Sequence, residues 1–119
     1  SQGSFAHAPE WFTTAPVGAM KRALEKAKLK ASDIDLYEIN EAFAAVTMAA
    51  TKELSLDADK VNVHGGAVAL GHPIGASGAR VVLHLMHILK RQGAKRGVAS
   101  LCIGGGQGGA MLIENVDSI

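Results

Sequence analysis

The sequence has only one cysteine, Cys102, in 119 residues. A single cysteine cannot form a disulfide within the chain, which excludes a disulfide-stapled secreted scaffold and favours a reducing compartment. The remaining composition, with 48% hydrophobic and 19% charged residues, is typical of one globular domain with a single core.

An excess of charge of either sign is also absent. The 12 Lys and Arg residues and 11 Asp and Glu residues give a formal net charge of +1. A field this weak does not indicate nucleic acid or an anionic membrane as a partner. We interpret the one basic cluster as a solvated helix end; it comprises Lys90, Arg91, Lys95 and Arg96.

Long hydrophobic runs are missing too. No apolar segment approaches the roughly 18 residues that span a bilayer, and no charged-then-apolar leader opens the chain. We therefore expect a soluble, cytoplasmic protein with no membrane partner. Because the chain starts at Ser1 without Met and residues 1–20 show little apolar periodicity, we interpret it as a fragment.

The hydrophobic pattern predicts helices alternating with strands, which indicates the α/β class. An amphipathic helix is expected over 15–29, and a short strand over 33–39 leads to Asn40 as the cap of a helix over 41–54. A helix over 76–92 is expected to end at a left-handed Gly93. Strands over 96–103 and 110–116 then enclose a glycine run.

Two of the predicted helices are unusually apolar. Nearly every residue over 42–50 is apolar or small, as in helices that are buried on all sides. In the helix over 76–92, Leu83 projects from the face opposite the main apolar stripe. Either the core is locally crowded, or these helices require a second layer of protein that this chain does not supply.

Three chemically useful side chains fall where strands end and helices begin: Asn40, His72 and Cys102. Loops converge at such places in α/β proteins. Each residue also has a plain structural interpretation, as a helix cap, a loop hydrogen-bonding group and a small core residue. The glycines of "GGGQGG", residues 104–109, favour a site, because they let backbone N–H groups approach a ligand or an oxyanion. The run lacks the pattern of a phosphate loop.

The segments "NEAFA", "GHPIGASGAR" and "CIGGGQGGAM", which begin at residues 40, 71 and 102, resemble in order and spacing the three C-terminal signature blocks of the thiolases. The resemblance covers essentially the whole chain. It implies the C-terminal half of an αβαβα layered fold, with a mixed sheet and helices on both faces. The chain would start inside or just after the first strand of that half, so that the domain occupies residues 1–119 without the N-terminal half.

The resemblance also implies roles for individual residues. Cys102 would be the acid/base that takes or returns the α-proton of an acyl-CoA, and His72 would activate the nucleophile and hold the thioester oxygen. Asn40 would fix a water in one oxyanion hole. The N–H of Gly104 would donate in the second hole, and Ala42 and Phe43 would line the pantetheine channel. Because a free thiol is a weak base at neutral pH, we expect His72 to lower the pKa of Cys102.

One departure from the family limits what the chain does alone. The family's covalent nucleophile is a second cysteine in the N-terminal half, and this chain has none. The implied activity, condensation of two acetyl-CoA or thiolysis of a 3-ketoacyl-CoA in fatty acid metabolism, would therefore belong to a full-length homodimer or homotetramer. Coenzyme A thioesters would be substrates, and no cofactor or metal is expected. The alternatives are a non-catalytic folding or association module, a sterol-carrier-type thiolase or a ketoacyl synthase relative.

The remaining histidines are interpreted more plainly. His84 and His87 lie three residues apart on a predicted helix, a spacing that can bind a metal, but no third ligand is evident and solvated surface is the better interpretation. The segment "PEWF" at residues 9–12 either lines an acyl pocket or covers an edge of the core.

Overall fold

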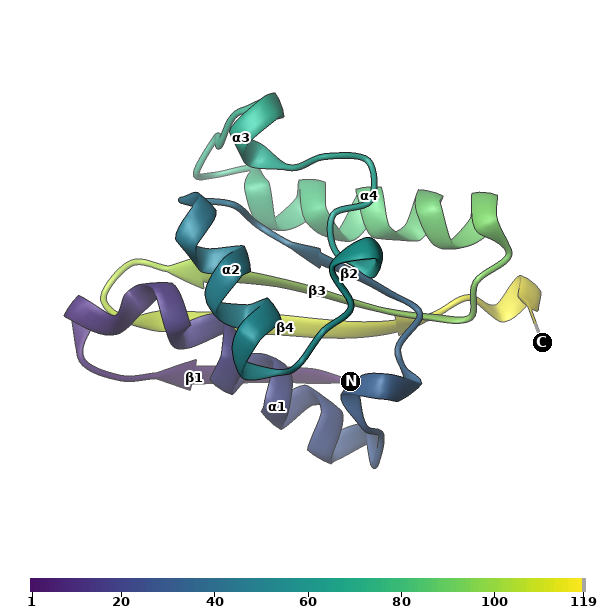
Figure 1. The fold of residues 1–119 in the computed structure, drawn as a ribbon, viewed down its shortest axis with the longest axis horizontal. Coiled ribbons are helices and arrows are strands. Elements are labelled where there is room, and N and C mark those ends of the chain that lie inside the picture. The colour runs from purple at the N-terminus through teal and green to yellow at the C-terminus, as the bar shows by residue number, and fades with distance from the viewer. Residues whose placement is uncertain (119) are drawn as a thin grey trace.

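A mixed β-sheet organises the chain in the computed structural model, which describes residues 1–118 (Figure 1). The strands and helices, in chain order, are β1 (Gln2–Ala6), α1 (Ala15–Ala27), β2 (Leu36–Ile39), α2 (Ala44–Glu53), α3 (Ala67–Leu70), α4 (Ser77–Gln92), β3 (Arg96–Ile103) and β4 (Gln107–Glu114). Short 3₁₀ turns lie at Pro9–Thr14, Ala31–Asp33, Ala58–Lys60 and Val116–Ser118.

The strands are ordered β1-β4-β3-β2 across the sheet. The β1–β4 and β4–β3 pairs are antiparallel, and the β3–β2 pair is parallel. Helix α4 runs along one side of the sheet and α1 along the other (Figure 1). The expected α/β class, with a mixed sheet and helices on both faces, is confirmed.

The alternation of side chains along the strands divides the core into two layers. On one face Tyr37, Ile39 and Val98 pack with α1 and α2, in a cluster that includes Met20 and Val46.

On the other face, Leu36 and Ala99 pack against the apolar stripe of α4, which comprises Val81, Leu85, Ile88 and Leu89. The predicted stripe, which also included Val82, is therefore the face that the sheet covers, with Val82 half-buried at its margin.

Glycines let α1 lie directly on the antiparallel strands. A Cβ atom on Gly3 of β1 would stand 2.3 Å from the Ala19 carbonyl oxygen. One on Gly108 of β4 would stand 2.5 Å from the Ala15 carbonyl oxygen. Both distances are far below a normal contact, so any side chain at these positions would push the helix off the sheet. Part of the glycine run therefore serves packing.

Several predicted boundaries are corrected. Asn40 is not the cap of α2, because the helix begins at Ala44 and Phe43 takes the N-cap position in an extended conformation. Strand β4 begins at Gln107, earlier than the expected residue 110. Residues 64–75, which lead into α4, contain the short helix α3.

Both unusually apolar helices leave hydrophobic side chains uncovered. Helix α2 buries Val46 and Ala50, whereas Met48 is 70% exposed. On α4, Leu83 is 56% exposed. The expectation that the helix over 42–50 is surrounded by protein is not met within this chain. No helix among residues 1–118 is both long and apolar enough to cross a bilayer.

Candidate functional site

The candidate site forms at the edge of the sheet where β2 and β3 end. These strands are parallel, and the N–H of Asn40, the residue after β2, donates to the Ser100 carbonyl of β3 at 2.9 Å. Cys102 lies two residues further along β3. Parallel strands present their carboxyl ends at one edge, which is the usual place of a site in α/β proteins.

Asn40 and Cys102 face opposite sides of the sheet. Asn40 is fully buried on the α4 side, where its amide contacts His72 and Arg80. Cys102 is half-buried and packs against the cluster formed with α1 and α2. The sheet edge therefore separates the amide from the thiol, and a substrate reaching both would lie across the ends of the strands.

Burial raises the pKa of the Cys102 thiol, and a backbone hydrogen bond opposes this with a smaller effect. The expected lowering of this pKa by His72 is wrong for this chain. With a raised pKa, Cys102 is a thiol at neutral pH, which is the form that can give a proton away.

His72 lies in the loop between α3 and α4, where its ring is held from one side. Its Nδ1 atom is 2.5 Å from Ser77 Oγ and 3.3 Å from Asn40 Nδ2. Ser77 is buried at the start of α4, so the helix terminus fixes the ring. Gly71, with φ of 99°, makes the turn that leads into the loop. His72 itself is exposed, which leaves its Nε2 edge open to a ligand.

The glycine turn between β3 and β4 follows Cys102 and Ile103 in the chain. Gly105 and Gly106 have φ of 76° and 78°, a left-handed conformation that favours glycine. Gly104 is exposed, and a Cβ atom there would meet nothing within 4 Å. The space beside its Cα atom is therefore open.

Ala42 and Phe43 lie just before α2. Ala42 is half-buried against the core. Phe43 is 61% exposed, and its ring meets that of Phe12 edge-on with 6.0 Å between centroids. The aromatic segment at 9–12 is thus adjacent to the predicted channel residue.

A carboxyl–imidazole pair adjoins the site. Glu38 of β2 is 1% exposed, and its Oε1 lies 2.9 Å from His84 Nδ1. Burial raises the pKa of Glu38 to about 7, opposed by the nearby Arg80 charge and reinforced by Glu41. Burial also lowers the pKa of His84, helped by the Arg80, His64 and His87 charges. The interpretation of His84 as solvated surface is therefore wrong, because the adjacent strand supplies a carboxyl partner.

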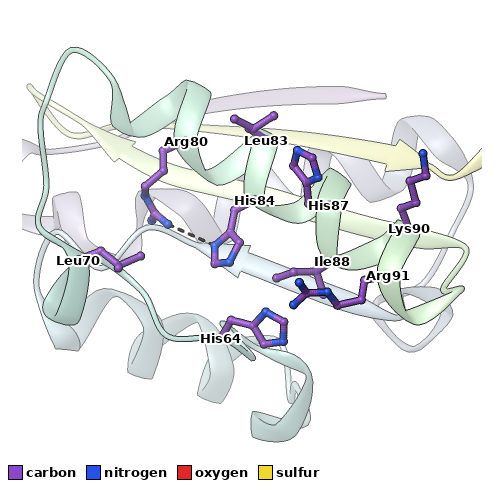
Figure 2. Close-up of a pocket in the computed structure, with 9 residues that line it drawn as sticks. All are labelled: His64, Leu70, Arg80, Leu83, His84, His87, Ile88, Lys90 and Arg91. Carbon is purple, nitrogen blue, oxygen red and sulfur yellow. Dashed lines mark hydrogen bonds between the residues drawn. The ribbon is translucent and has the colours of Figure 1, made fainter.

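An open groove of about 670 Å³ runs along α4 next to this pair. Figure 2 shows Arg80 and His84 side by side on α4, with Leu70 and His64 coming from the segment before the helix. The other lining residues are Leu83, His87, Ile88, Lys90 and Arg91. Among residues 1–118, no three His, Cys, Asp or Glu side chains are grouped to hold a metal ion.

Sequence reasoning missed Glu38, Ser77 and Arg80. A carboxyl within the otherwise apolar strand "LYEI" was a signal for the first. Ser77 and Arg80 lie three residues apart, which places them on the same face of a helix. That face was not recognised because no residue on it matched a catalytic pattern by itself.

Comparison with known proteins gives consistent matches. The model of the family "Thiolase, C-terminal domain" matches residues 1–115. The cytosolic acetyl-CoA acetyltransferase of Mus musculus is 55% identical over 106 residues, which cover 89% of this chain and 27% of the relative. The Schizosaccharomyces pombe acetyl-CoA acetyltransferase is 50% identical over 114 residues, 96% of this chain and 29% of the relative.

Solved structures agree with these matches. The Bacillus anthracis acetyl-CoA acetyltransferase superposes with a TM-score of 0.93 at 50% identity, over 95% of this chain and 29% of that one. Human mitochondrial 3-ketoacyl-CoA thiolase in complex with CoA gives a TM-score of 0.94 at 48% identity, over 97% and 29%. The chain thus spans less than a third of the length of these relatives.

Proposed function

This chain belongs to the thiolase family, and from that premise we propose that it supplies one half of the active site of an acyl-CoA C-acyltransferase. The reaction is the condensation of two acetyl-CoA molecules or the thiolysis of a 3-ketoacyl-CoA. The observation that supports this most directly is the meeting of Asn40 and His72 at the end of parallel strands, next to the strand that carries Cys102.

Cys102 is the proton donor and acceptor in this proposal. Its raised pKa suits the thiolysis direction, in which a neutral thiol protonates the departing acetyl-CoA carbanion. In the synthetic direction the thiol must first lose its proton. A cation or hydrogen-bond donors brought by the substrate or by the missing half would lower the pKa for that step.

His72 and Asn40 stabilise negative charge on the thioester oxygen. The exposed edge of His72 provides one donor for that oxygen, Asn40 fixes a water that provides the second, and each well-placed donor is typically worth roughly 3–4 kcal/mol. The N–H of Gly104 serves the second acyl group, and Phe43 and Ala42 border the path of the pantetheine arm. His72 also activates the nucleophile.

The nucleophile itself must come from outside this chain, because Cys102 is its one cysteine. We propose that a full-length protein with an N-terminal half provides it and that the protein forms a dimer or tetramer in the cytoplasm. The relatives named cytosolic in mouse and rat support that location.

The second candidate, an association module without catalysis, is favoured by one observation. Met48 and Leu83 expose apolar surface on two different helices, as expected of a domain that binds another layer. If the domain is only an association module, replacing Cys102 or His72 should leave the thiolysis activity of the full-length protein unchanged.

The experiment uses the full-length protein, with acyl-enzyme trapping alongside steady-state thiolysis. Cys102→Ala should lower thiolysis by roughly 10²–10⁴-fold, the usual contribution of a general acid–base group, while acyl-enzyme still forms. His72→Ala should lower both. His87→Ala, which removes an exposed imidazole from α4, is the matched control and should change neither. Near-normal thiolysis in Cys102→Ala would show that the thiol is a core residue and would favour the association module.

A further inference from the structure

Arg80 contacts the candidate site through the side chain of Asn40. Its Nη2 lies 3.5 Å from Asn40 Oδ1, and its Nη1 lies 3.4 Å from His84 Nδ1. A guanidinium group has donors and no acceptor. The end of the Asn40 amide that faces Arg80 must therefore be the oxygen.

This orientation decides what the other end of the amide does. Asn40 is fully buried, so its amide cannot turn toward solvent. With Oδ1 toward Arg80, the Nδ2 group lies 3.3 Å from His72 Nδ1. Because an amide nitrogen only donates, His72 Nδ1 must accept, which means that it carries no proton.

Ser77 provides a second donor to the same ring atom. Its Oγ is 2.5 Å from His72 Nδ1 and 3.1 Å from the Pro73 carbonyl oxygen. That carbonyl already accepts the backbone N–H groups of Ala76 at 2.8 Å and Ser77 at 2.9 Å, and these occupy its two lone pairs. The hydroxyl hydrogen is therefore better placed on the shorter contact, toward the ring.

We propose that Arg80 is a positioning residue that orients the amide of Asn40 and thereby keeps the proton of neutral His72 on Nε2. The exposed edge of His72 then presents an N–H donor to an incoming thioester oxygen. The consequence for catalysis rests on the function proposed above, whereas the tautomer itself does not. The reverse tautomer would place the Nδ1–H of His72 against the N–H of Asn40.

The proposal separates the two roles of His72. Holding the thioester oxygen uses the Nε2–H directly. Activating the nucleophile needs a free lone pair on Nε2, which a neutral ring has only in the tautomer protonated on Nδ1. Loss of Arg80 should therefore slow the carbon–carbon step, which depends on the donor, more than it slows acylation.

The test measures the tautomer in the full-length protein labelled with ¹⁵N-histidine, by solid-state NMR at pH 8.5. Loss of signals in a His72→Gln variant identifies the resonances of His72. We expect Nδ1 at the shift of an unprotonated ring nitrogen and Nε2 at the shift of a protonated one. Arg80→Met should make both tautomers visible, and Arg80→Lys, which keeps a donor, should restore most of the original signal.

Kinetics provide the second readout. Arg80→Met should lower kcat for thiolysis by about 10-fold or more, since a lost oxyanion donor costs up to about 10²–10³-fold, with acyl-enzyme formation changed less. Arg91→Met removes a cation from the same helix and groove and is the matched control, expected to behave as the parent.

Two results would overturn the proposal: a wild-type His72 protonated on Nδ1, or an Arg80→Met variant with His72 signals unchanged from those of Arg91→Met. If Arg80→Met fails to fold, the spectra of the wild-type protein and of Arg80→Lys still test the tautomer of His72. A wild-type protein without thiolysis activity would instead refute the proposed function, and the tautomer would be judged by the spectra alone.

Discussion

Replacing Glu38 by Gln should stabilise the chain at pH 8 and leave its stability unchanged at pH 4. In the folded state this carboxyl is 1% exposed and burial raises its pKa from 4.5 to about 7. At roughly 1.4 kcal/mol for each pH unit, the difference corresponds to about 3 kcal/mol. This is the largest gain expected from removing the charge.

The sign follows from proton binding in the two states. Between pH 4.5 and about 7 the folded chain keeps the Glu38 proton and the unfolded chain loses it. The unfolded state then binds fewer protons, so the free energy of unfolding falls as the pH rises through this range. Above pH 7 both states are ionised and the penalty is constant. Gln carries no proton to lose, so the variant escapes the penalty.

The assay is urea unfolding of the 119-residue chain, followed by circular dichroism at several pH values between 4 and 8, for the parent and Glu38→Gln. The difference in unfolding free energy should grow from near zero to as much as about 3 kcal/mol. His84→Asn should show the opposite trend, because the lowered pKa of His84 penalises the folded state as the pH falls through the usual His range. Parallel pH curves for the parent and Glu38→Gln would refute the reasoning.

Two further predictions concern β3 and β4. Gly108→Ala should lower the free energy of unfolding by roughly 1–3 kcal/mol, because its Cβ would lie 2.5 Å from the Ala15 carbonyl oxygen. Urea unfolding measures this against the control Gly104→Ala, where a Cβ meets nothing within 4 Å, and equal midpoints for the two variants would show that α1 does not pack tightly on β4. Iodoacetamide should alkylate Cys102 slowly at pH 7, with a rate that still rises past pH 9, because burial raises the pKa of the thiol. Mass spectrometry follows the reaction, and an alkylation rate that stops rising below pH 8 would contradict the raised pKa.

The sequence predicted the elements whose limits are set by local chemistry. Strand β3 over Arg96–Ile103 matches the prediction, because glycines bound it on the C-terminal side. Helix α4 ends at Gln92 before a left-handed Gly93, as expected. Strand β4 was predicted to start late because Gly108 and Gly109 look like turn residues. Gly108 belongs to the strand because α1 packs directly on it, and a sequence pattern does not show this contact.

The candidate site was only partly predictable for the same reason. Asn40, His72 and Cys102 were recognised because each falls in a signature segment at the end of a strand or before a helix. Their contact partners lie far away in sequence: Arg80 is 40 residues from Asn40, and His84 is on another element from Glu38. A burial-driven change in pKa also depends on the assembled core, so the raised pKa of Cys102 could not be foreseen from a cysteine beside glycines.

The pairing of β1 with β4 has a consequence for how the chain acquires its fold. Strand β1, at Gln2–Ala6, pairs with β4, at Gln107–Glu114. During synthesis β1 therefore leaves the ribosome well before β4, and its backbone hydrogen bonds to that strand cannot form until β4 follows. Pairings of such long sequence separation are slow to form. Until β4 is present, Phe5 and the face of α1 that packs on β4 lack that strand as a partner. We therefore expect nascent chains that end before Gln107 to bind chaperones.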